Sequence, residues 1–377
     1  MAELGKSYKS LVSDDMARLA AARPQLGARQ ARIGVIGVGW WAMTNHIPML
    51  KARRDVELVS VCGLDDAVND RIKRDFGIAH STRDHKELLK QGLDGVVVAS
   101  PHALHAEHTL AALDAGCHVL VEKPMATSSA DARQMARSAR QKGKHLVVSF
   151  GWNYRPLTVK AVDAMASGKV GRIEYVNGFL GSPSKELFAG RSCEFAAGAY
   201  VEPNMATYVD PKLSGGGFGQ GQLTHALGLL FYLTDLKPKA VFARMGKQDA
   251  PSDVHDALAI TFDDGRIGTI GGTATVPIGA PYQLDIRIFG SHGMLLYDIE
   301  RERLELHTHG GEHSIVPVEA GEGAYRCDGP PHEFVELILG LTEHNHAPGE
   351  IGLKTVQVLE AAYRSDQSGR EEAVSEG

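Results

Sequence analysis

A lysine and a histidine in this chain stand in settings that side-chain packing alone does not explain. Lys123 follows Glu122 directly after the apolar run HVLV, and Pro124, the next residue, restricts the backbone there. His225 stands at the front of an apolar segment, in the stretch GGGFGQGQLTHALG. Imidazole titrates near neutral pH and a lysine ammonium donates to oxygen, so both are candidates for acid–base or electrostatic chemistry. Each also has a structural alternative. The lysine could form an ion pair with Glu122, and the histidine could be a hydrogen-bonded residue at the start of a helix.

The glycine-rich stretch before His225 allows three interpretations: a flexible linker, a loop that cradles phosphate, or a device that aims the histidine. A second glycine pattern competes for the phosphate role. Gly37, Gly39 and Ala42 in RIGVIGVGWWA form G-x-G-x-x-A directly after a predicted strand and ahead of a predicted helix. In a dinucleotide site the first glycine makes the tight turn and the second lets the backbone approach a pyrophosphate. We therefore predict the dinucleotide site at residues 37–42.

The end of the second predicted strand bears on the choice of cofactor. An acidic residue there binds the ribose hydroxyls of NAD in many such domains. Here the strand ends VSVCGLDD, so Gly63 takes the expected place and Asp65 comes slightly late. No arginine or lysine stands at residues 63–66 to receive a 2′-phosphate. We expect NAD, with NADP as the alternative, and Asp65 as either a ribose ligand or merely the N-terminal acid of the next helix.

Polar residues gather where the predicted parallel strands end. In an open parallel sheet, ligands bind beyond the carboxyl ends of the strands. The residues at these ends are Ser100, Pro101, His102, the nearby His105, Glu122, Lys123 and the segment GWNYRP at 151–156.

Strands and helices alternate in the part of the chain that carries these motifs. Runs rich in valine and isoleucine predict strands at 33–36, 56–62, 95–99, 118–121 and 145–150. Helical patterns lie between them, at 43–52, 66–76, 85–91, 106–115 and 129–142. This alternation predicts a parallel sheet buried on both faces, in a doubly wound domain at residues 31–150. Residues 1–30 are expected to form an N-terminal arm with a short helix at 14–22.

Residues 151–377 show a different pattern and are predicted to form a second domain. Helices are expected at 156–165 and 223–233, with a long irregular stretch at 180–217 between them. Alternating strand patterns follow, with turn signals at 263–265 and 291–293 that fit hairpins. Two helices at 332–342 and 352–365 precede a charged tail. This order predicts a helix-and-strand domain built on a largely antiparallel sheet.

The bulk composition limits the classes of partner. The chain has 377 residues, of which 43% are hydrophobic and 23% charged, enough for two folded domains. A formal net charge of −6 gives no electrostatic reason to expect nucleic acid or an anionic membrane as a partner. No apolar run could span a bilayer, and the N-terminal residues lack the apolar centre of a signal peptide. Four cysteines without paired spacing, Cys62, Cys117, Cys193 and Cys327, complete the expectation of a cytoplasmic protein.

Four segments resemble one known family. They are RIGVIGVGWWA, DGVVVASPHALHAEHTLAALDAGCHVLVEKP, GWNYRP and VLEAAYRSDQSGR, and the family is that of glucose–fructose oxidoreductase, inositol dehydrogenase and rhizopine catabolism (Gfo/Idh/MocA). The resemblance extends over residues 31–368 except for 180–211. It implies a Rossmann domain followed by an α/β domain whose large, mostly antiparallel open sheet packs subunits together, as a homodimer or homotetramer. It also implies a pyridine nucleotide and redox chemistry at a carbon of a sugar, glycoside, cyclitol or related polyol.

The resemblance assigns roles by position. Lys123 matches the catalytic lysine of the family, and His225 matches the histidine of its G-G-G-x-x-x-D-x-x-x-H segment. The aspartate of that segment faces the substrate in the family, but here Gly221 takes its position, with Gln222 beside it. Weaker candidates for substrate contact are Asn153, Arg155, Tyr208 and Gln222. The residues expected at the cofactor are Gly37, Val38, Gly39, Trp40, Trp41, Asp65, Ser100, Pro101, His105, Glu122 and Lys123.

For alcohol oxidation, we expect His225 to act as general base and Lys123 to polarise the substrate oxygen. Two alternatives stay open: a redox-elimination glycosidase with tightly held NAD, and a non-catalytic nucleotide-sensing regulator. The presence of both Lys123 and His225 argues against the regulator, whereas the missing aspartate favours it. The substrate itself cannot be read from the sequence, because region 180–211, the expected pocket wall, is where the resemblance is weakest.

Further histidines raise the question of a metal. His307, His309 and His313 in HTHGGEH, and His344 with His346, offer metal-ligating nitrogens. Their predicted background of strands and turns favours a structural role, and we expect no metal site.

Overall fold

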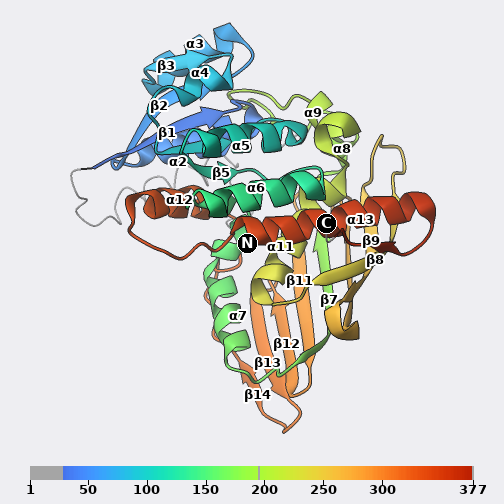
Figure 1. The fold of residues 1–377 in the computed structure, drawn as a ribbon. Coiled ribbons are helices and arrows are strands. Elements are labelled where there is room, and N and C mark those ends of the chain that lie inside the picture. The colour runs from blue at the N-terminus through green and yellow to red at the C-terminus, as the bar shows by residue number, and fades with distance from the viewer. Residues whose placement is uncertain (1–28, 194–195, 376–377) are drawn as a thin grey trace.

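The computed structural model of the protein describes residues 29–193 and 196–375. Within these residues the strands form two sheets, one of six strands and one of nine. In Figure 1 the elements of the first sheet lie at one end of the molecule and the long strands of the second extend to the other. The predicted helix at 14–22, and all but the last two residues of the predicted arm, lie outside the described residues.

The six-stranded sheet is parallel and runs in the order β3-β2-β1-β4-β5-β6. Its central strands are buried on both faces, since every residue of β4 is inaccessible to solvent. The order reverses between β1 and β4, which is where a doubly wound sheet opens a crevice for ligands. The predicted Rossmann architecture is confirmed. The strands are β1 (Ala31–Ile36), β2 (Val56–Cys62), β3 (His80–Thr82), β4 (Gly95–Val98), β5 (His118–Val121) and β6 (Leu146–Val148).

Helices connect these strands at the positions that the periodicity predicted. Three of them begin at side-chain caps, in which Asp65, Asp84 and Ser128 each accept a hydrogen bond from a backbone N–H group of the first helical turn. The first crossover opens differently, with a π-helical turn at Ala42–His46 that runs directly into α2. The helices are α2 (Ile47–Ala52), α3 (Asp66–Phe76), α4 (His85–Leu89), α5 (His105–Asp114) and α6 (Ser129–Gln141).

The nine-stranded sheet is mostly antiparallel, with β7 and β10 as a parallel pair at its centre. The expected hairpins are present: Asp263–Gly265 joins β9 to β10, and Ser291 and His292 join β11 to β12. The charged tail differs from expectation, since Glu372–Ala373 forms β15, which pairs with β8 and is an edge strand of the sheet. The other strands are β7 (Ile173–Gly181), β8 (Pro238–Gly246), β9 (His255–Phe262), β10 (Ile267–Thr273), β11 (Gln283–Gly290), β12 (Gly293–Asp298), β13 (Arg303–Thr308) and β14 (His313–Ile315).

Helices from the second half of the chain join the two sheets. Helix α13 contacts α6 of the first half as well as α11 and β8 of the second, and Figure 1 shows it between them. Helix α12 packs on β1 and β5, where Phe334 and Ile338 approach Gly95. The core of the parallel sheet therefore includes residues from the C-terminal part of the chain, and a domain boundary at residue 150 stays a prediction. The helices are α7 (Pro156–Ala166), α11 (Thr224–Leu233), α12 (Gly329–Leu339) and α13 (Gly349–Ser368).

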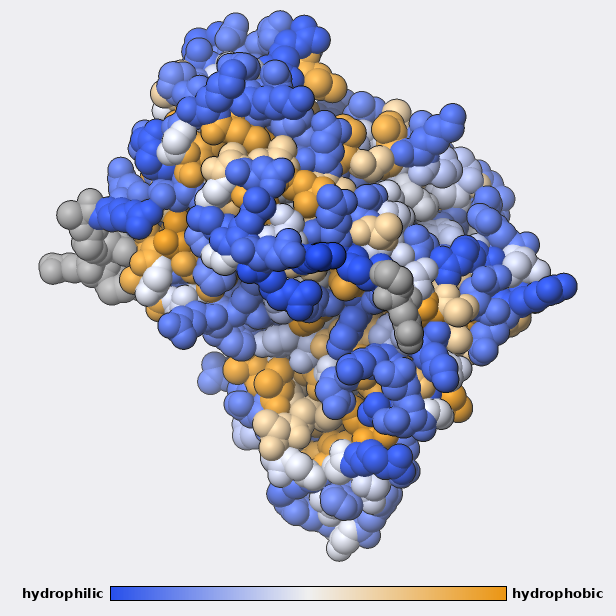
Figure 2. All heavy atoms as spheres, viewed as in Figure 1, coloured by the Kyte–Doolittle hydropathy of each residue, from blue (hydrophilic) through white to orange (hydrophobic). Residues whose placement is uncertain are grey.

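In the irregular stretch at 180–217, the residues that the structure describes include the short helices α8 (Lys185–Phe188), α9 (Ala206–Val209) and α10 (Pro211–Ser214). The face shown in Figure 2 is largely hydrophilic, with hydrophobic side chains in separate groups. Among the described residues, no helix combines the length and the apolarity that crossing a bilayer requires.

The packing of α12 leads to a prediction about stability. Phe334 is fully buried against Gly95, so truncating it to alanine should leave a cavity and lower the free energy of unfolding by about 3–5 kcal/mol. Urea denaturation followed by circular dichroism measures this change. The control is Leu341→Ala, because Leu341 is 58% exposed just beyond the same helix and should change stability by less than about 0.5 kcal/mol. Equal stability of the two variants would contradict the packing of α12 on the parallel sheet.

Candidate active site

A cavity of about 770 Å³ lies at the carboxyl ends of the parallel strands. This volume is within the range of cavities that hold small ligands. The cavity reaches from the glycine turn after β1, past the ends of β4 and β5, to the start of α11, with the 183–208 segment on its outer side. Both predicted catalytic residues, Lys123 and His225, line it.

The glycine turn after β1 requires glycine at its first position. Gly37 has φ of +91°, and a Cβ there would lie 2.4 Å from the Ser100 backbone nitrogen. Around Gly39 the space is open, with no heavy atom within 4 Å of where a Cβ would stand. Backbone at Gly39 is thus free to approach a ligand in the cavity. Of the residues predicted at the cofactor, all line the cavity: Gly37, Val38, Gly39, Trp40, Trp41, Asp65, Ser100, Pro101, His105, Glu122 and Lys123.

Asp65, after the end of β2, takes the predicted place at the N-terminus of the next helix, and its role as a ribose ligand stays a prediction. Its side chain caps α3 through the Val68 amide, and the residue also lines the cavity. Sequence inspection missed Arg83, which follows β3 and lines the same region. Arg83 is largely exposed, with its Nη1 3.5 Å from the Asp66 carboxylate. A positive charge therefore does line the cavity near the end of β2, and it comes from the residue after β3 rather than from β2 itself.

Glu122 is a buried carboxylate with several hydrogen-bond partners. Its Oε1 lies 2.7 Å from His46 Nε2 and accepts a hydrogen bond of 2.9 Å from Trp41 Nε1. Its Oε2 accepts from the backbone N–H of Lys123 at 3.2 Å. Burial raises the pKa of Glu122, but His46 and Lys123 outweigh that effect and bring the pKa to about 2. Glu122 is therefore an anion held in a fixed position in the lining of the cavity.

Lys123 spans the cavity from the end of β5 to the glycine-rich stretch. Its Nζ donates a hydrogen bond of 2.9 Å to the carbonyl oxygen of Gly221. Burial lowers the pKa of Lys123, and the adjacent Glu122 carboxylate offsets part of that effect. The carbonyl of Gly221 thus provides a partner for the ammonium where the family pattern has an aspartate side chain.

The glycine-rich stretch is anchored by the buried carboxylate of Asp253, with the buried Asp256 beside it. Asp253 Oδ1 and Oδ2 accept from the backbone N–H groups of Gly217 and Gly219 at 2.8 and 2.7 Å. The Tyr363 hydroxyl of α13 donates to Asp253 Oδ1 at 3.0 Å. Residues Gly219–Leu223 then form a π-helical turn that continues into α11. The stretch is therefore a fixed support for the helix that carries His225, and the linker interpretation is wrong.

His225 is buried, with 3% of its surface exposed, among aromatic rings. The Trp152 ring lies edge-on at 5.1 Å between centroids, and the Tyr325 ring at 5.7 Å. Burial and the nearby Lys123 lower the pKa of His225 well below 6.5. Its buried Nδ1 has no hydrogen-bond partner among the described residues. The imidazole is therefore neutral at physiological pH and able to accept a proton.

Residues 183–188 and 201–208 contribute to the wall of the cavity, as predicted for this region. The region is attached through a small apolar cluster in which Trp40 packs with Leu187, Cys193 and Ala196. Trp41 and Tyr208 pack against the same cluster. The two tryptophans that follow Gly39 therefore hold the wall as well as lining the cavity.

The remaining predicted residues fall into two groups. Tyr208 and Gln222 line the cavity as predicted substrate contacts. His105 lines it too, but its Nδ1 and Nε2 each lie 2.8 Å from a backbone carbonyl oxygen, of Pro124 and Ser100. Its imidazole thus positions the two loops on which Lys123 and Ser100 stand.

The structure corrects the prediction for Asn153 and Arg155, because neither lines the cavity. Asn153 is fully buried and its Nδ2 donates to the His346 carbonyl at 2.9 Å. Arg155 is also buried and its Nη2 donates to the Gly321 carbonyl at 3.2 Å. The chain after β6 turns in a 3₁₀ helix, Gly151–Tyr154, which aims Trp152 at the cavity and the residues after it elsewhere.

Sequence inspection missed several aromatic residues at the His225 end of the cavity. Trp152, Phe188, Tyr282 and Tyr325 all line it, from four separate segments of the chain. Only Trp152 had a signal, as part of the GWNYRP motif. The others come from irregular stretches whose placement depends on tertiary packing.

The histidine clusters lie away from this end. Ligand atoms of Glu305, His307 and His313 lie within 4.8 Å of one another on β13 and β14. There, Arg303 and His307 both hydrogen-bond the Glu305 carboxylate, which lowers its pKa to about 2. The absence of a metal site stays a prediction.

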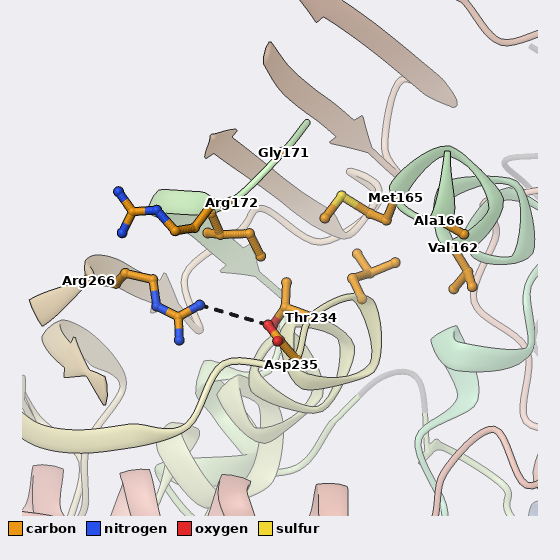
Figure 3. Close-up of a pocket in the computed structure, with 10 residues that line it drawn as sticks. Val162, Met165, Ala166, Gly171, Arg172, Thr234, Asp235 and Arg266 are labelled. Carbon is orange, nitrogen blue, oxygen red and sulfur yellow. Dashed lines mark ion pairs between the residues drawn. The ribbon is translucent and has the colours of Figure 1, made fainter. Parts of the chain in front are cut away.

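A second, smaller cavity of about 390 Å³ lies at the opposite end of α11 (Figure 3). Apolar side chains of α7 and α11 line it together with Arg172, Asp235 and Arg266, and Arg266 Nη1 lies 3.9 Å from Asp235 Oδ1. Neither Lys123 nor His225 reaches this cavity, so the larger one is the candidate active site.

Two family models match the chain. Residues 31–150 match "Oxidoreductase family, NAD-binding Rossmann fold", and residues 158–296 match "GFO/IDH/MocA C-terminal domain". Together they cover more than half of the chain. The chain belongs to the Gfo/Idh/MocA family. The resemblance seen in the sequence is thereby confirmed, and residues 31–150 carry the NAD-binding Rossmann fold of this family.

Curated Gfo/Idh/MocA relatives match parts of the chain. A 1-carboxy-3-chloro-3,4-dihydroxycyclohexa-1,5-diene dehydrogenase from Comamonas testosteroni is 30% identical over 62% of this chain and 55% of its own length. A D-glucoside 3-dehydrogenase from Escherichia coli K12 is 36% identical over 38% of this chain and 41% of its own length. The matches thus span about half the length of these relatives.

A solved structure resembles the fold over nearly the whole chain. It is that of GenD2 from gentamicin A biosynthesis in complex with NAD, with a TM-score of 0.72 and 24% identity. The match covers 94% of this chain and 99% of GenD2, and it supports the two-sheet architecture.

The carboxylate pair under the glycine-rich stretch leads to a prediction on pH and stability. Burial and the neighbouring Asp253 raise the pKa of Asp256 well above 3.8. A carboxyl with a raised folded-state pKa loses its stabilising contribution as pH rises from its unfolded pKa through the folded one. Asp256→Asn, which mimics the protonated form, should therefore gain stability relative to the wild type as pH rises from 4 to 8. Urea midpoints at several pH values measure this difference.

The exposed Asp70 serves as control, and Asp70→Asn should show no such trend. Asp253→Asn should destabilise the protein throughout this range, because the backbone N–H groups of Gly217 and Gly219 would lose a charged acceptor. A constant difference between Asp256→Asn and wild type across pH would show that Asp256 is ionised in the folded protein.

Proposed function

We propose that this protein is an NAD-dependent oxidoreductase that transfers a hydride between nicotinamide and a secondary alcohol or ketone carbon of a sugar, glycoside or cyclitol. The observation that carries the proposal is the convergence of Lys123 and His225 in the cavity that also contains the glycine turn. The names of the two curated relatives, a glucoside dehydrogenase and a dehydrogenase of a dihydroxycyclohexadiene, support oxidation of a ring alcohol.

The residues of the cavity fit a dinucleotide. Gly37 makes the tight turn, Gly39 leaves its backbone open to a pyrophosphate, and Asp65 lines the cavity and would bind the ribose hydroxyls. Ser100, Pro101 and Glu122 would line the nicotinamide side. NAD is favoured over NADP because β2 ends without a basic residue, although Arg83 keeps NADP as the alternative. The bound nucleotide would take up the hydride that leaves the carbinol carbon during oxidation.

The side chains divide the remaining chemistry between them. We assign His225 as the base that accepts the hydroxyl proton, since its imidazole is neutral and its Nδ1 has no protein partner within the described structure. Lys123 would hydrogen-bond the substrate oxygen and stabilise its developing negative charge. The carbonyl of Gly221 holds the ammonium in place for this role. Reduction of a ketone would reverse both steps.

Subunit association belongs to the same proposal. The nine-stranded sheet is open, with β14 and β15 as its edges, and we propose that homodimers or homotetramers form through it.

Removal of either catalytic side chain should abolish most of the turnover. His225→Ala and Lys123→Ala should each lower kcat by about 10²–10⁴, the usual contribution of a positioned acid or base. NAD should still bind, because the glycine turn is intact, and quenching of tryptophan fluorescence measures this. Lys142→Ala and His344→Ala are matched controls at exposed sites. If both catalytic-site variants kept wild-type turnover, the assignment would be wrong.

The pH profile tests the state of the two groups in the free enzyme. The pKa of His225 lies well below 6.5, so kcat/KM for oxidation should not decline between pH 7.5 and 6.5, where an ordinary histidine becomes protonated. The pKa of Lys123 lies below 10.5, so an alkaline decline should begin below that pH as the ammonium is lost. Initial rates from pH 5 to 10 measure both limbs. An acid limb centred at or above pH 6.5 would contradict the buried, neutral imidazole.

A further inference from the structure

A chain of hydrogen bonds runs from helix α13 to the ammonium of Lys123. The Tyr363 hydroxyl of α13 donates to Asp253 Oδ1 at 3.0 Å, and the same oxygen accepts from the backbone N–H of Gly217 at 2.8 Å. The carbonyl of Gly217 accepts from the N–H of Gly221 at 2.9 Å. The carbonyl of Gly221 in turn accepts from Lys123 Nζ at 2.9 Å. Every link has the length of an ordinary hydrogen bond, so the chain is continuous from the helix to the amine.

The glycine-rich stretch is shaped to admit the Tyr363 hydroxyl. A Cβ built on Gly216 would lie 2.1 Å from Tyr363 Oη, and a Cβ on Gly219 would lie 2.8 Å from it. Both distances are shorter than a side chain tolerates, so the hydroxyl needs glycine at these two positions. The N–H of Gly219 also donates to Asp253 Oδ2 at 2.7 Å. The run of glycines thus accommodates a hydrogen-bonded contact with α13.

Tyr363 itself does not line the cavity. Its acceptor, Asp253, is only 3% exposed, so removal of the hydroxyl would leave a buried carboxylate oxygen with one donor fewer. That oxygen is the one that holds the N–H of Gly217. An effect of Tyr363 on the chemistry would therefore reach Lys123 through the support of the glycine-rich stretch.

From this chain we infer that Tyr363 is a positioning residue for Lys123, which acts through Asp253 and the glycine-rich stretch to hold the Gly221 carbonyl against the ammonium. The inference rests on the proposed oxidoreductase function and adds to it a residue outside the cavity. A carbonyl oxygen held against an amine favours the charged form of that amine. The Tyr363 hydroxyl therefore helps to keep Lys123 protonated and in place beside the substrate oxygen.

Other titratable groups also act on Lys123, and the test leaves all of them unchanged. They lie on its own segment, after β4, on α11 and just before α12, and they are Glu122, His102, His105, His225 and Cys327. Tyr363→Phe removes only the hydroxyl. A change in the titration of Lys123 in this variant would therefore report the hydrogen-bond chain.

The first measurement compares Tyr363→Phe with the wild type in NAD-dependent oxidation of ring alcohols, including glucose, methyl glucoside and myo-inositol. The variant should lower kcat by about tenfold, because the ammonium is held less firmly, and should change the affinity for NAD by less than about twofold. The alkaline decline of kcat/KM should move to lower pH by about half to one pH unit, part of what the loss of a whole charged hydrogen bond causes. Initial rates across pH and quenching of tryptophan fluorescence measure these changes.

A second measurement needs no substrate. Competitive acetylation with acetic anhydride at a series of pH values, followed by mass spectrometry of the peptide that contains Lys123, reports the pH at which this amine loses its proton. The midpoint should be lower in Tyr363→Phe than in the wild type by about half to one pH unit. The midpoint of Lys142, which pairs with Asp114 at the surface, should be unchanged.

Ser365→Ala is the matched control on the same helix. Ser365 is fully buried, and its hydroxyl accepts from the Ala243 N–H and donates to the Arg370 carbonyl, away from the glycine-rich stretch. Its loss should lower the thermal unfolding midpoint, as Tyr363→Phe does, because each variant removes a hydrogen bond to a buried group. It should leave kcat and the alkaline decline unchanged. A purely structural effect would appear in both variants.

A double-mutant cycle tests the contact between the hydroxyl and the stretch. Gly219→Ala places a methyl group 2.8 Å from the Tyr363 oxygen and should destabilise the wild type. In the Tyr363→Phe background that oxygen is gone, so the same substitution should cost less stability. Urea unfolding of the four proteins measures this coupling, and strict additivity would contradict the contact.

The outcomes separate this inference from the proposed function. Equal acetylation midpoints in Tyr363→Phe and the wild type, or equal kinetic effects of Tyr363→Phe and Ser365→Ala, would overturn the inference and leave the oxidoreductase proposal intact. If the acetylation midpoint shifts but no ring alcohol of the panel reduces NAD, the link from Tyr363 to Lys123 stands and the oxidoreductase proposal fails.

Discussion

The hydrogen bond from Lys123 Nζ to the carbonyl oxygen of Gly221 joins the two halves of the protein at the point where the chemistry is placed. The ammonium comes from the end of a parallel strand and the carbonyl from the turn that opens α11. The hydrogen bond forms only if the ammonium and the carbonyl oxygen are held 2.9 Å apart. The buried Glu122 fixes the lysine side, and the Asp253 carboxylate fixes the glycine side through Gly217 and Gly219. The rest of the fold keeps these two supports in register.

Helix α13 contacts both halves of the protein. It lies against α6 of the parallel-sheet half and against α11 and β8 of the other half. Its Tyr363 also donates to the carboxylate that supports the glycine-rich stretch. One helix therefore touches the framework on both sides of the cavity and the loop between them. Helix α13 therefore supports both of the segments that the hydrogen bond between Lys123 and Gly221 joins.

Local patterns in the sequence were sufficient to predict the parallel sheet and the functional residues at the ends of its strands. Valine-rich runs between helical patterns predicted the parallel sheet, because burial on both faces leaves a continuous apolar signature. Local patterns and the family resemblance also predicted the glycine turn at Gly37, the lysine of the Glu122–Lys123–Pro124 segment, and His225 of α11. The predictions for Asn153 and Arg155 were wrong because a 3₁₀ turn directs successive side chains to different sides. No pattern in GWNYRP specifies which of these side chains faces the cavity. The positions of Phe188, Tyr282 and Tyr325 in the cavity wall could not be predicted, because long-range packing brings them together from three irregular regions of the chain.

The small apolar cluster around Trp40 ties the outer wall to the turn that follows β1. Trp40 and Trp41 stand immediately after Gly39, and Trp41 also donates to Glu122. Movement of residues 183–188 and 201–208 would therefore disturb the residues that follow Gly39 in the glycine turn. The outer wall of the cavity and the glycine turn therefore share two adjacent indole rings, Trp40 and Trp41, as a common support.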